Sequence, residues 1–281
     1  MMIASGDDMK NDESPLRLGT VPYCNAWPLT HYLARELPGS LVSEWLPSAM
    51  RLRLMAHHLD LALMPIAELM NLPHGKIVSD CCIGCRGAVW SVRLVSTVPL
   101  SRIKTISLDT SSRSSVTLCE LMLRHFFDVS PEKFKLNVSK PLNRCKTDAL
   151  VVIGDRALTF APDDRWEHRV DLGELWKEKT GLPFVFAAWI SCSPRVWNRP
   201  GLVDGLQSAR NRGVASVDSI LDEKEADGVS FPVPRERTRM YLSQAVHYTI
   251  DVQERQAIQS FFDLAVLHGL TKHRTVLELI R

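Results

Sequence analysis

A dense group of hydroxyl side chains occurs in the run TSSRSS, which lies between an apolar strand pattern and an apolar helix pattern. The first turn of a helix leaves about four backbone N–H groups without partners and carries roughly half a positive charge. Small hydroxyl residues add donors there and let an anion approach the backbone. We therefore expect the run to bind a carboxylate or a phosphate through Ser111, Ser112, Ser114 and Ser115, and Arg113 could form a bidentate pair with a carboxylate. The alternative is simple capping by one serine, with the others facing solvent.

A second candidate is the loop after the strand predicted at 16–21. Tyr23 and Asn25 lie in this loop, on either side of a cysteine. The side-chain amide of Asn25 offers both a hydrogen-bond donor and an acceptor to a ligand. The same residue also suits the N-cap of the helix predicted at 25–37. Both roles are open on the sequence alone.

A third candidate follows the continuous apolar strand predicted at 148–153. Gly154 and Asp155 come directly after that strand. The Asp155 carboxylate could accept a hydrogen bond from a substrate hydroxyl, or it could merely pair with Arg156.

Strands and helices alternate along the chain around these loops. Strands are predicted at 16–21, 40–46, 60–64, 103–109, 134–139, 148–154 and 183–191, with broken strands over 76–98. Helices are predicted at 25–37, 47–59, 114–128, 170–181, 195–211, 214–226, 235–249, 251–268 and 271–281. This order predicts an α/β fold with mostly parallel sheets. In such sheets ligands bind beyond the carboxyl ends of the strands, which is where the three polar loops lie.

The composition limits the class of protein. With 281 residues, of which 45% are hydrophobic, the chain can form one large domain or two lobes. A net charge of +2 gives no electrostatic reason to expect nucleic acid or an anionic membrane as partner. No apolar run approaches the roughly 20 residues of a membrane-spanning helix. Residues 1–14 are polar and lack the apolar core of a signal peptide, so we expect a disordered tail and a cytoplasmic protein.

The seven cysteines are an odd number spread through apolar segments, which indicates reduced thiols. Cys82 and Cys85 form a C-x-x-C, but no second pair stands at a zinc-like spacing, so we expect buried structural thiols and no metal. Glycine-rich nucleotide motifs are also absent from the sequence, and we expect no cofactor. From the residues alone, the chain is a two-lobed α/β protein that binds a small anion.

Several stretches together resemble one family. They are LGTVPYCNAWPL, DLALMPIAEL, GAVWSVRLVSTVPL, ISLDTSSRSSVTL, ALVVIGDRAL and DLGELWKEKTGLPFVFAAW, in this order between residue 17 and about residue 190. They are similar to the chorismate dehydratase family of the futalosine route to menaquinone. The last ninety residues match that family only in being helical.

The resemblance implies a fold like that of the type II periplasmic binding proteins, with two α/β lobes around a cleft. Residues 15–97 and 191–281 would form lobe one, the second range as a helical return, and residues 98–190 would form lobe two. The strands that cross between the lobes would be 91–96 and 184–190.

The resemblance also implies a hydro-lyase that removes water from chorismate, a dicarboxylate, to give 3-[(1-carboxyvinyl)oxy]benzoate. Asn25 would be the catalytic residue, and the enolpyruvyl carboxylate of the substrate itself would act as the base. The cradle of Ser111, Ser112, Ser114 and Ser115 would take one substrate carboxylate. Tyr23, Gly154 and Asp155 would contribute to the walls of the cleft.

The sequence departs from the family pattern at two places near the expected cleft. Residues 85–89 read Cys-Arg-Gly-Ala-Val, and Ile66 stands where the family tends to have serine. Arg86 could be a compensating cation for a substrate carboxylate. Two alternatives follow, the related enzyme that makes 1,4-dihydroxy-6-naphthoate and a non-catalytic binder of small anions. A homodimer through the helical C-terminal third is possible.

Overall fold

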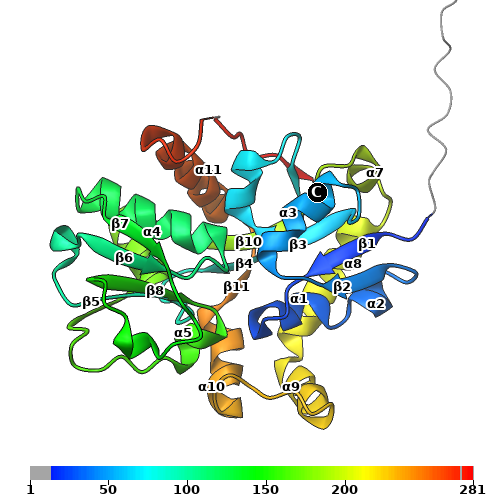
Figure 1. Cartoon of the computed structure of the whole chain (residues 1–281). Helices are drawn as coiled ribbons and strands as arrows, with labels where there is room; N and C mark the ends of the chain where they lie inside the picture. The colour runs from blue at the N-terminus through cyan, green and yellow to red at the C-terminus, as the bar shows by residue number, and fades with distance from the viewer. Residues whose placement is uncertain (1–13, 273, 281) are drawn as a thin grey trace, which may run out of the picture.

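The computed structural model describes residues 14–272 and 274–280, which form two lobes (Figure 1), each built on a sheet. The seven-stranded sheet of lobe one has the order β11-β4-β10-β3-β1-β2, and β12 pairs with β4 off this path. Its strands are β1 (Arg17–Thr20), β2 (Leu41–Glu44), β3 (Leu61–Pro65), β4 (Lys76–Cys85), β10 (Phe184–Ser191), β11 (His247–Thr249) and β12 (Leu279–Ile280). β1 runs parallel to both β2 and β3, whereas β10 runs antiparallel to β3 and β4.

The five-stranded sheet of lobe two has the order β7-β6-β8-β5-β9. Its strands are β5 (Val92–Ser96), β6 (Thr105–Leu108), β7 (Glu132–Lys135), β8 (Ala149–Ile153) and β9 (His168–Asp171). β6 is parallel to β7 and β8, and β5 is antiparallel to β8 and β9. Both sheets are therefore mixed, with parallel strands next to antiparallel ones that connect to the other lobe. This is the predicted two-lobed α/β architecture.

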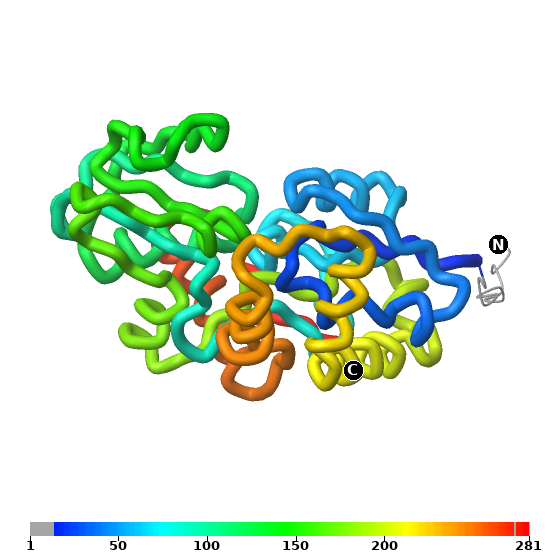
Figure 2. The backbone as a smooth tube through the Cα atoms, turned by 90° about the horizontal axis from the view of Figure 1, so that it is seen from below, coloured from blue at the N-terminus to red at the C-terminus, as the bar shows by residue number. Residues whose placement is uncertain are grey.

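Helices cover both sheets. They are α1 (Trp27–Thr30), α2 (Leu33–Glu36), α3 (Pro47–Met55), α4 (Arg113–Phe126), α5 (Asp155–Thr159), α6 (Leu172–Thr180), α7 (Pro194–Trp197), α8 (Leu202–Ala215), α9 (Val217–Ala226), α10 (Arg235–Met240) and α11 (Val252–Leu267). Short 3-10 helices lie at Cys24–Ala26, Ile66–Asn71, Leu100–Arg102 and Leu142–Arg144, and a π-helix lies at Tyr241–Ala245. Seen from below, the orange segment that contains α10 lies at the junction of the green and blue lobes (Figure 2). None of the described helices is long and apolar enough to cross a bilayer.

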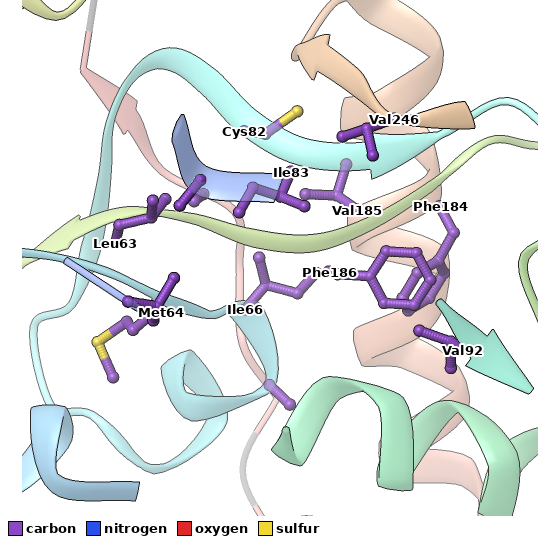
Figure 3. Close-up of a cluster of buried hydrophobic side chains, with 14 of the residues drawn as sticks. Leu63, Met64, Ile66, Cys82, Ile83, Val92, Phe184, Val185, Phe186 and Val246 are labelled. Atoms are coloured by element: carbon purple, nitrogen blue, oxygen red, sulfur yellow. The ribbon is translucent and has the colours of Figure 1, made fainter. Parts of the chain in front are cut away.

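The hydrophobic core continues from one lobe into the other. Every residue of β3 and of β8 is buried, as expected for strands covered on both faces. Figure 3 shows the part of the core where β3, β4 and β10 meet β5 and α4, with Phe186, Ile83 and Val92 among the packed side chains. This apolar packing supports the strands whose ends form the site.

The chain crosses from one sheet to the other at positions that differ from the expected lobe boundaries, 97 and 190. β5 pairs within the sheet of lobe two, and β10 pairs within the sheet of lobe one. The chain therefore passes between the sheets after Cys85 and again before Phe184. Strand pairing is a long-range property, and the apolar pattern of a strand does not say which sheet it joins.

The structure corrects two predicted helices and adds a strand that was not predicted. The helix predicted at 235–249 ends as a π-helix at Ala245, and residues 247–249 form β11. The helix predicted at 271–281 is absent from its described part, where Leu279–Ile280 pairs with β4. β9 was not predicted as a strand. Short edge strands carry too few residues for a period to be read. Residues 1–13 of the predicted tail lie outside the described residues.

Candidate functional site

A pocket lies between the lobes and encloses about 580 Å³, counting its open mouth. Its polar lining residues are Tyr23, Asn25, Ser91, Ser111, Ser112 and Ser115. Its other lining residues include Val21, Leu63, Met64, Ile83, Val92, Ile153, Gly154 and Phe186. Of the described residues that line it, none carries a charged side chain. The pocket thus combines apolar walls with a few hydroxyl and amide groups, which is typical of small-molecule sites.

The serine run opens α4 and borders the pocket, as the sequence predicts. Ser112 is the N-cap residue, and its Oγ accepts hydrogen bonds from the N–H of Ser115 at 3.4 Å and from the Oγ of Ser115 at 3.1 Å. The N–H of Ser111 donates to Oδ1 of Asp109 at 3.1 Å. Ser112 therefore caps the helix and also lines the pocket, so the two roles are not alternatives.

Ser114 does not line the pocket. Its side chain is fully buried, and its Oγ accepts a hydrogen bond from the N–H of Ala67 at 3.1 Å. Ala67 belongs to the 3-10 turn after β3 of lobe one. Ser114 therefore ties α4 to the other lobe, and the structure gives it no access to a ligand in this pocket.

Asn25 lies inside the 3-10 turn Cys24–Ala26, and its side chain makes no capping hydrogen bond. The N-cap role open on the sequence is therefore wrong. Its Oδ1 is buried and has no hydrogen-bond partner among residues 14–272 and 274–280. An unpartnered buried acceptor is costly, unless a ligand satisfies it. Asn25 is thus the pocket residue with the clearest unused hydrogen-bonding capacity.

Tyr23 reaches from lobe one to lobe two. Its hydroxyl interacts with the side chain of Ser111, and burial raises the pKa of Tyr23 above its usual value. Its ring faces Gly154, where an added Cβ would lie 3.9 Å from the ring. Gly154 has a φ of 66° and donates its N–H to the carbonyl of Ser91 at 2.8 Å. Both predicted residues, Tyr23 and Gly154, line the pocket.

Asp155 lies just behind the pocket wall and is not one of the lining residues. Its Oδ1 accepts a hydrogen bond from the thiol of Cys24 at 3.3 Å, and burial raises the pKa of Asp155. The neighbouring Arg156 forms its ion pair with Asp109 instead, at 2.7 Å. Asp155 therefore supports the wall rather than facing a ligand.

Arg86 also lies away from the pocket lining. Its Nε donates to Oε1 of Glu254 at 2.9 Å, and its guanidinium also pairs with Asp251. Glu254 is fully buried and belongs to the capping box of α11. A buried carboxylate needs a compensating cation. The structure thus assigns the charge of Arg86 to α11, and nothing places it near a substrate carboxylate.

Ser91 lines the pocket although its sequence context does not predict it. It is 3% exposed, and its Oγ accepts a hydrogen bond from the hydroxyl of Tyr241 at 2.8 Å. A single serine directly before a strand carries no recognisable local pattern. Only the helical return of lobe one, which supplies Tyr241, shows that Ser91 belongs to a polar cluster.

The thiols of the C-x-x-C segment are buried within β4, as predicted. Burial raises the pKa of Cys85 to about 12 and the pKa of Cys82 well above its usual value. Thiols of this kind stay protonated and are poor nucleophiles.

A second, more open space of about 1,250 Å³, counting the solvent at its mouth, adjoins the pocket. Pro47, Pro65 and Ser111 border both spaces. The charged residues around the second space are Arg51, Glu68, Arg113, Glu120, Arg124 and Lys133. Four of these six are cations, so the approach from this side is electropositive.

Known proteins with similar sequences include two chorismate dehydratases. A chorismate dehydratase of Thermus thermophilus is 29% identical over 228 residues, covering 74% of this chain and 81% of that protein. A chorismate dehydratase of Campylobacter jejuni is 23% identical over 249 residues, covering 86% and 94%.

Solved structures share the fold. A protein of Archaeoglobus fulgidus has a TM-score of 0.71 at 14% identity, with 92% of this chain and 99% of that chain covered. The alkanesulfonate-binding protein of Xanthomonas axonopodis has a TM-score of 0.65 at 13% identity, covering 94% and 96%.

A family model described as menaquinone biosynthesis matches residues 16–266, a range that includes all of lobe two, most of lobe one and every residue that lines the pocket. The chain belongs to this menaquinone biosynthesis family.

Proposed function

We propose that the protein is a chorismate dehydratase, a carbon–oxygen hydro-lyase that works without a cofactor. The single observation that carries the proposal is the pocket itself, in which the hydroxyls at the start of α4 and the unpartnered Oδ1 of Asn25 line one apolar space. Family membership and the names of the two relatives from Thermus thermophilus and Campylobacter jejuni support the choice of substrate.

The reaction breaks a C–H bond at the ring carbon that bears the enolpyruvyl ether and the C–O bond of the neighbouring hydroxyl. The electron pair of the C–H bond becomes the new ring π bond, the proton and the hydroxide leave as water, and the ring becomes aromatic. Aromatisation makes this step strongly downhill, so the protein needs mainly to orient and polarise the substrate. A pocket whose described lining holds no carboxylate or imidazole fits a reaction in which a substrate carboxylate accepts the proton.

The polar groups of the pocket have separate tasks in this proposal. Asn25 and Ser91 hold the departing hydroxyl, because an acceptor and a donor together orient an O–H group. The hydroxyls of Ser111, Ser112 and Ser115 and the positive end of α4 hold one carboxylate. Fixed dipoles of this kind lower a barrier without reorganising during the reaction.

Arg113 supplies the charge for the second carboxylate in this proposal. It is exposed at the first position of α4 and makes no hydrogen bond or ion pair with another described residue. A cation in the first helical turn is disfavoured by the helix dipole. The positive charge of Arg113 acts on the buried Glu68, which is also 3.2 Å from Arg51. An anion entering the electropositive space would relieve the unfavourable placement of Arg113.

The test is incubation of the purified protein with chorismate in the absence of added cofactor, followed by mass spectrometry. We expect a product lighter by one water that retains the enolpyruvyl group. Saturable binding of chorismate without turnover would instead identify a non-catalytic binder. Absence of both turnover and binding would overturn the proposal and favour the related naphthoate-forming enzyme.

A further inference from the structure

A fully buried tyrosine touches two polar residues of the pocket from behind. The hydroxyl of Tyr241 donates to Oγ of Ser91 at 2.8 Å, and the side chain of Asn25 interacts with the same hydroxyl. Both partners line the pocket, whereas Tyr241 itself is 1% exposed and does not. The tyrosine therefore lies where it can hold two pocket groups in a fixed relation.

The hydrogen bonds around this hydroxyl have a defined direction. Oδ1 of Asn25 has no partner in the described part of the chain, so the group that meets the tyrosine is the Asn25 amide NH2. Ser91 accepts from Tyr241, which leaves the proton of the serine free for another acceptor. The hydrogen-bonding groups left without a described partner are thus an acceptor on Asn25 and a donor on Ser91.

The backbone around Tyr241 is unusual at the same place. α10 continues into a π-helix over Tyr241–Ala245, the segment that begins with this tyrosine. π-helical turns are rare and occur frequently at functional sites. The ring of Trp90, next to Ser91, also stacks on Tyr241 with centroids 6.4 Å apart. Packing and backbone together fix the position of the phenol.

We propose that Tyr241 is a positioning residue, which sets the side-chain orientation of Asn25 and the hydrogen-bond polarity of Ser91 so that the pair grips one substrate hydroxyl. The substrate class is a hydroxylated carboxylate, and the claim about the reaction rests on the proposed dehydratase function. The claim about the side chains does not depend on which reaction the protein catalyses.

Tyr241→Phe tests the proposal, and Tyr248→Phe is its matched control. Tyr248 is also buried and neighbours Tyr241, but its hydroxyl has no partner among the residues described. Both variants lose one buried oxygen and keep the ring, so only the lost hydrogen bonds distinguish them. Tyr248→Phe should behave like the wild type in every readout below.

The first readout needs no substrate. In 15N-labelled protein, the side-chain NH2 signal of Asn25, assigned with Asn25→Ala, should shift in Tyr241→Phe and stay in place in Tyr248→Phe. An unshifted signal in Tyr241→Phe would overturn the proposal, whatever the protein's substrate is. An equal shift in both variants would also overturn it, because it would show a general packing effect.

The second readout is turnover of chorismate. Tyr241→Phe should lower kcat by roughly ten-fold or more, as expected for loss of a hydrogen bond that orients a reacting group, with KM nearly unchanged. The same substitution should have little further effect in an Asn25→Ala background. Equal, additive losses in both backgrounds would overturn the positioning role. If the wild-type protein does not convert chorismate, the proposed function is refuted. The NMR readout still decides the role of Tyr241 in that case.

Discussion

The thiol of Cys24 donates a hydrogen bond to Oδ1 of Asp155 over 3.3 Å. Cys24 precedes Asn25 in lobe one, and Asp155 follows Gly154 at the start of α5 in lobe two. The contact therefore joins the two walls of the pocket directly behind its lining. Burial raises the pKa of both groups, so the cysteine acts as a neutral donor to a carboxylate and not as a nucleophile.

The raised pKa of Asp155 predicts a pH-dependent contribution to stability. A carboxyl with a higher pKa in the folded state binds more protons when folded, so its contribution is present at low pH and is lost as the pH rises through the folded value. Asp155→Asn removes this dependence and keeps an oxygen that can accept from Cys24. We expect the variant to match the wild type most closely below the usual Asp pKa of about 3.9, and to become relatively more stable as the pH rises above it.

Urea denaturation at several pH values measures this difference in the free energy of unfolding. The control is Asp227→Asn, at an exposed carboxylate at the end of α9. A difference between Asp155→Asn and the wild type that stays constant with pH would contradict the assignment.

Arg86 should matter for stability and not for substrate binding. Arg86→Ala leaves the fully buried Glu254 with His247, at 3.5 Å, as its one remaining cation-forming ion-pair partner among the described residues. Removal of one partner of a fully buried ion pair costs about 3–5 kcal/mol, and we expect less here because Arg86 is half-exposed. We expect a lower midpoint of thermal unfolding and an unchanged KM for chorismate. Adding Glu254→Gln should restore part of the lost stability, because it removes the unpaired buried charge. A raised KM in Arg86→Ala would contradict this prediction and indicate that Arg86 contacts the substrate.

Arg113 should contribute to binding of the dianion. Arg113→Gln is expected to raise KM roughly ten-fold, because a hydrogen bond to a charged group contributes about 1.5–3 kcal/mol. Added salt should raise the KM of the wild type more than that of the variant, since screening weakens only the charged contact. Arg102→Gln removes an equally exposed charge of lobe two outside both spaces and serves as control. Equal KM values for the two variants would refute the assignment.

A side chain at position 154 should destabilise the fold because of the backbone conformation of Gly154, and not because of steric crowding. Its φ of 66° and ψ of −146° fall in a region essentially reserved for glycine, although the nearest atom to an added Cβ is the Tyr23 ring at 3.9 Å. Gly154→Ala should therefore cost about 1–3 kcal/mol. Gly87→Ala is the control, because Gly87 has no positive φ and an added Cβ meets nothing within 4 Å. Equal stability of the two variants in denaturant titrations would contradict this account.

Much of the fold and part of the site could be predicted because their signals are local. The buried strands β3 and β8 are continuous apolar stretches in the sequence, and the serine run marks the start of α4. Helix capping and strand burial depend on neighbours a few residues away. The pocket contacts of Tyr23, Asn25 and Gly154 followed from the rule that ligand loops come after parallel strands.

Partners far apart in the chain could not be predicted in the same way. Arg86 meets Glu254 across 168 positions, and Ser91 meets Tyr241 across 150. A charged or hydroxyl side chain near a cleft has the same local sequence whether it faces a ligand or a distant helix. Ser114, although within the predicted cradle, turned to Ala67 because successive residues on a helix point in different directions.

The sequence by itself determined which residue types stand at the ends of the strands, because hydrophobic period and helix-start chemistry are properties of short segments. Only the tertiary structure decided which of those side chains share a pocket. It turned Arg86 and Asp155 toward protein partners, left Oδ1 of Asn25 without a described partner, and brought Tyr241 behind Asn25 and Ser91. The physical reason is that buried charges and hydroxyls must find partners, and packing of both lobes determines which partners are within reach.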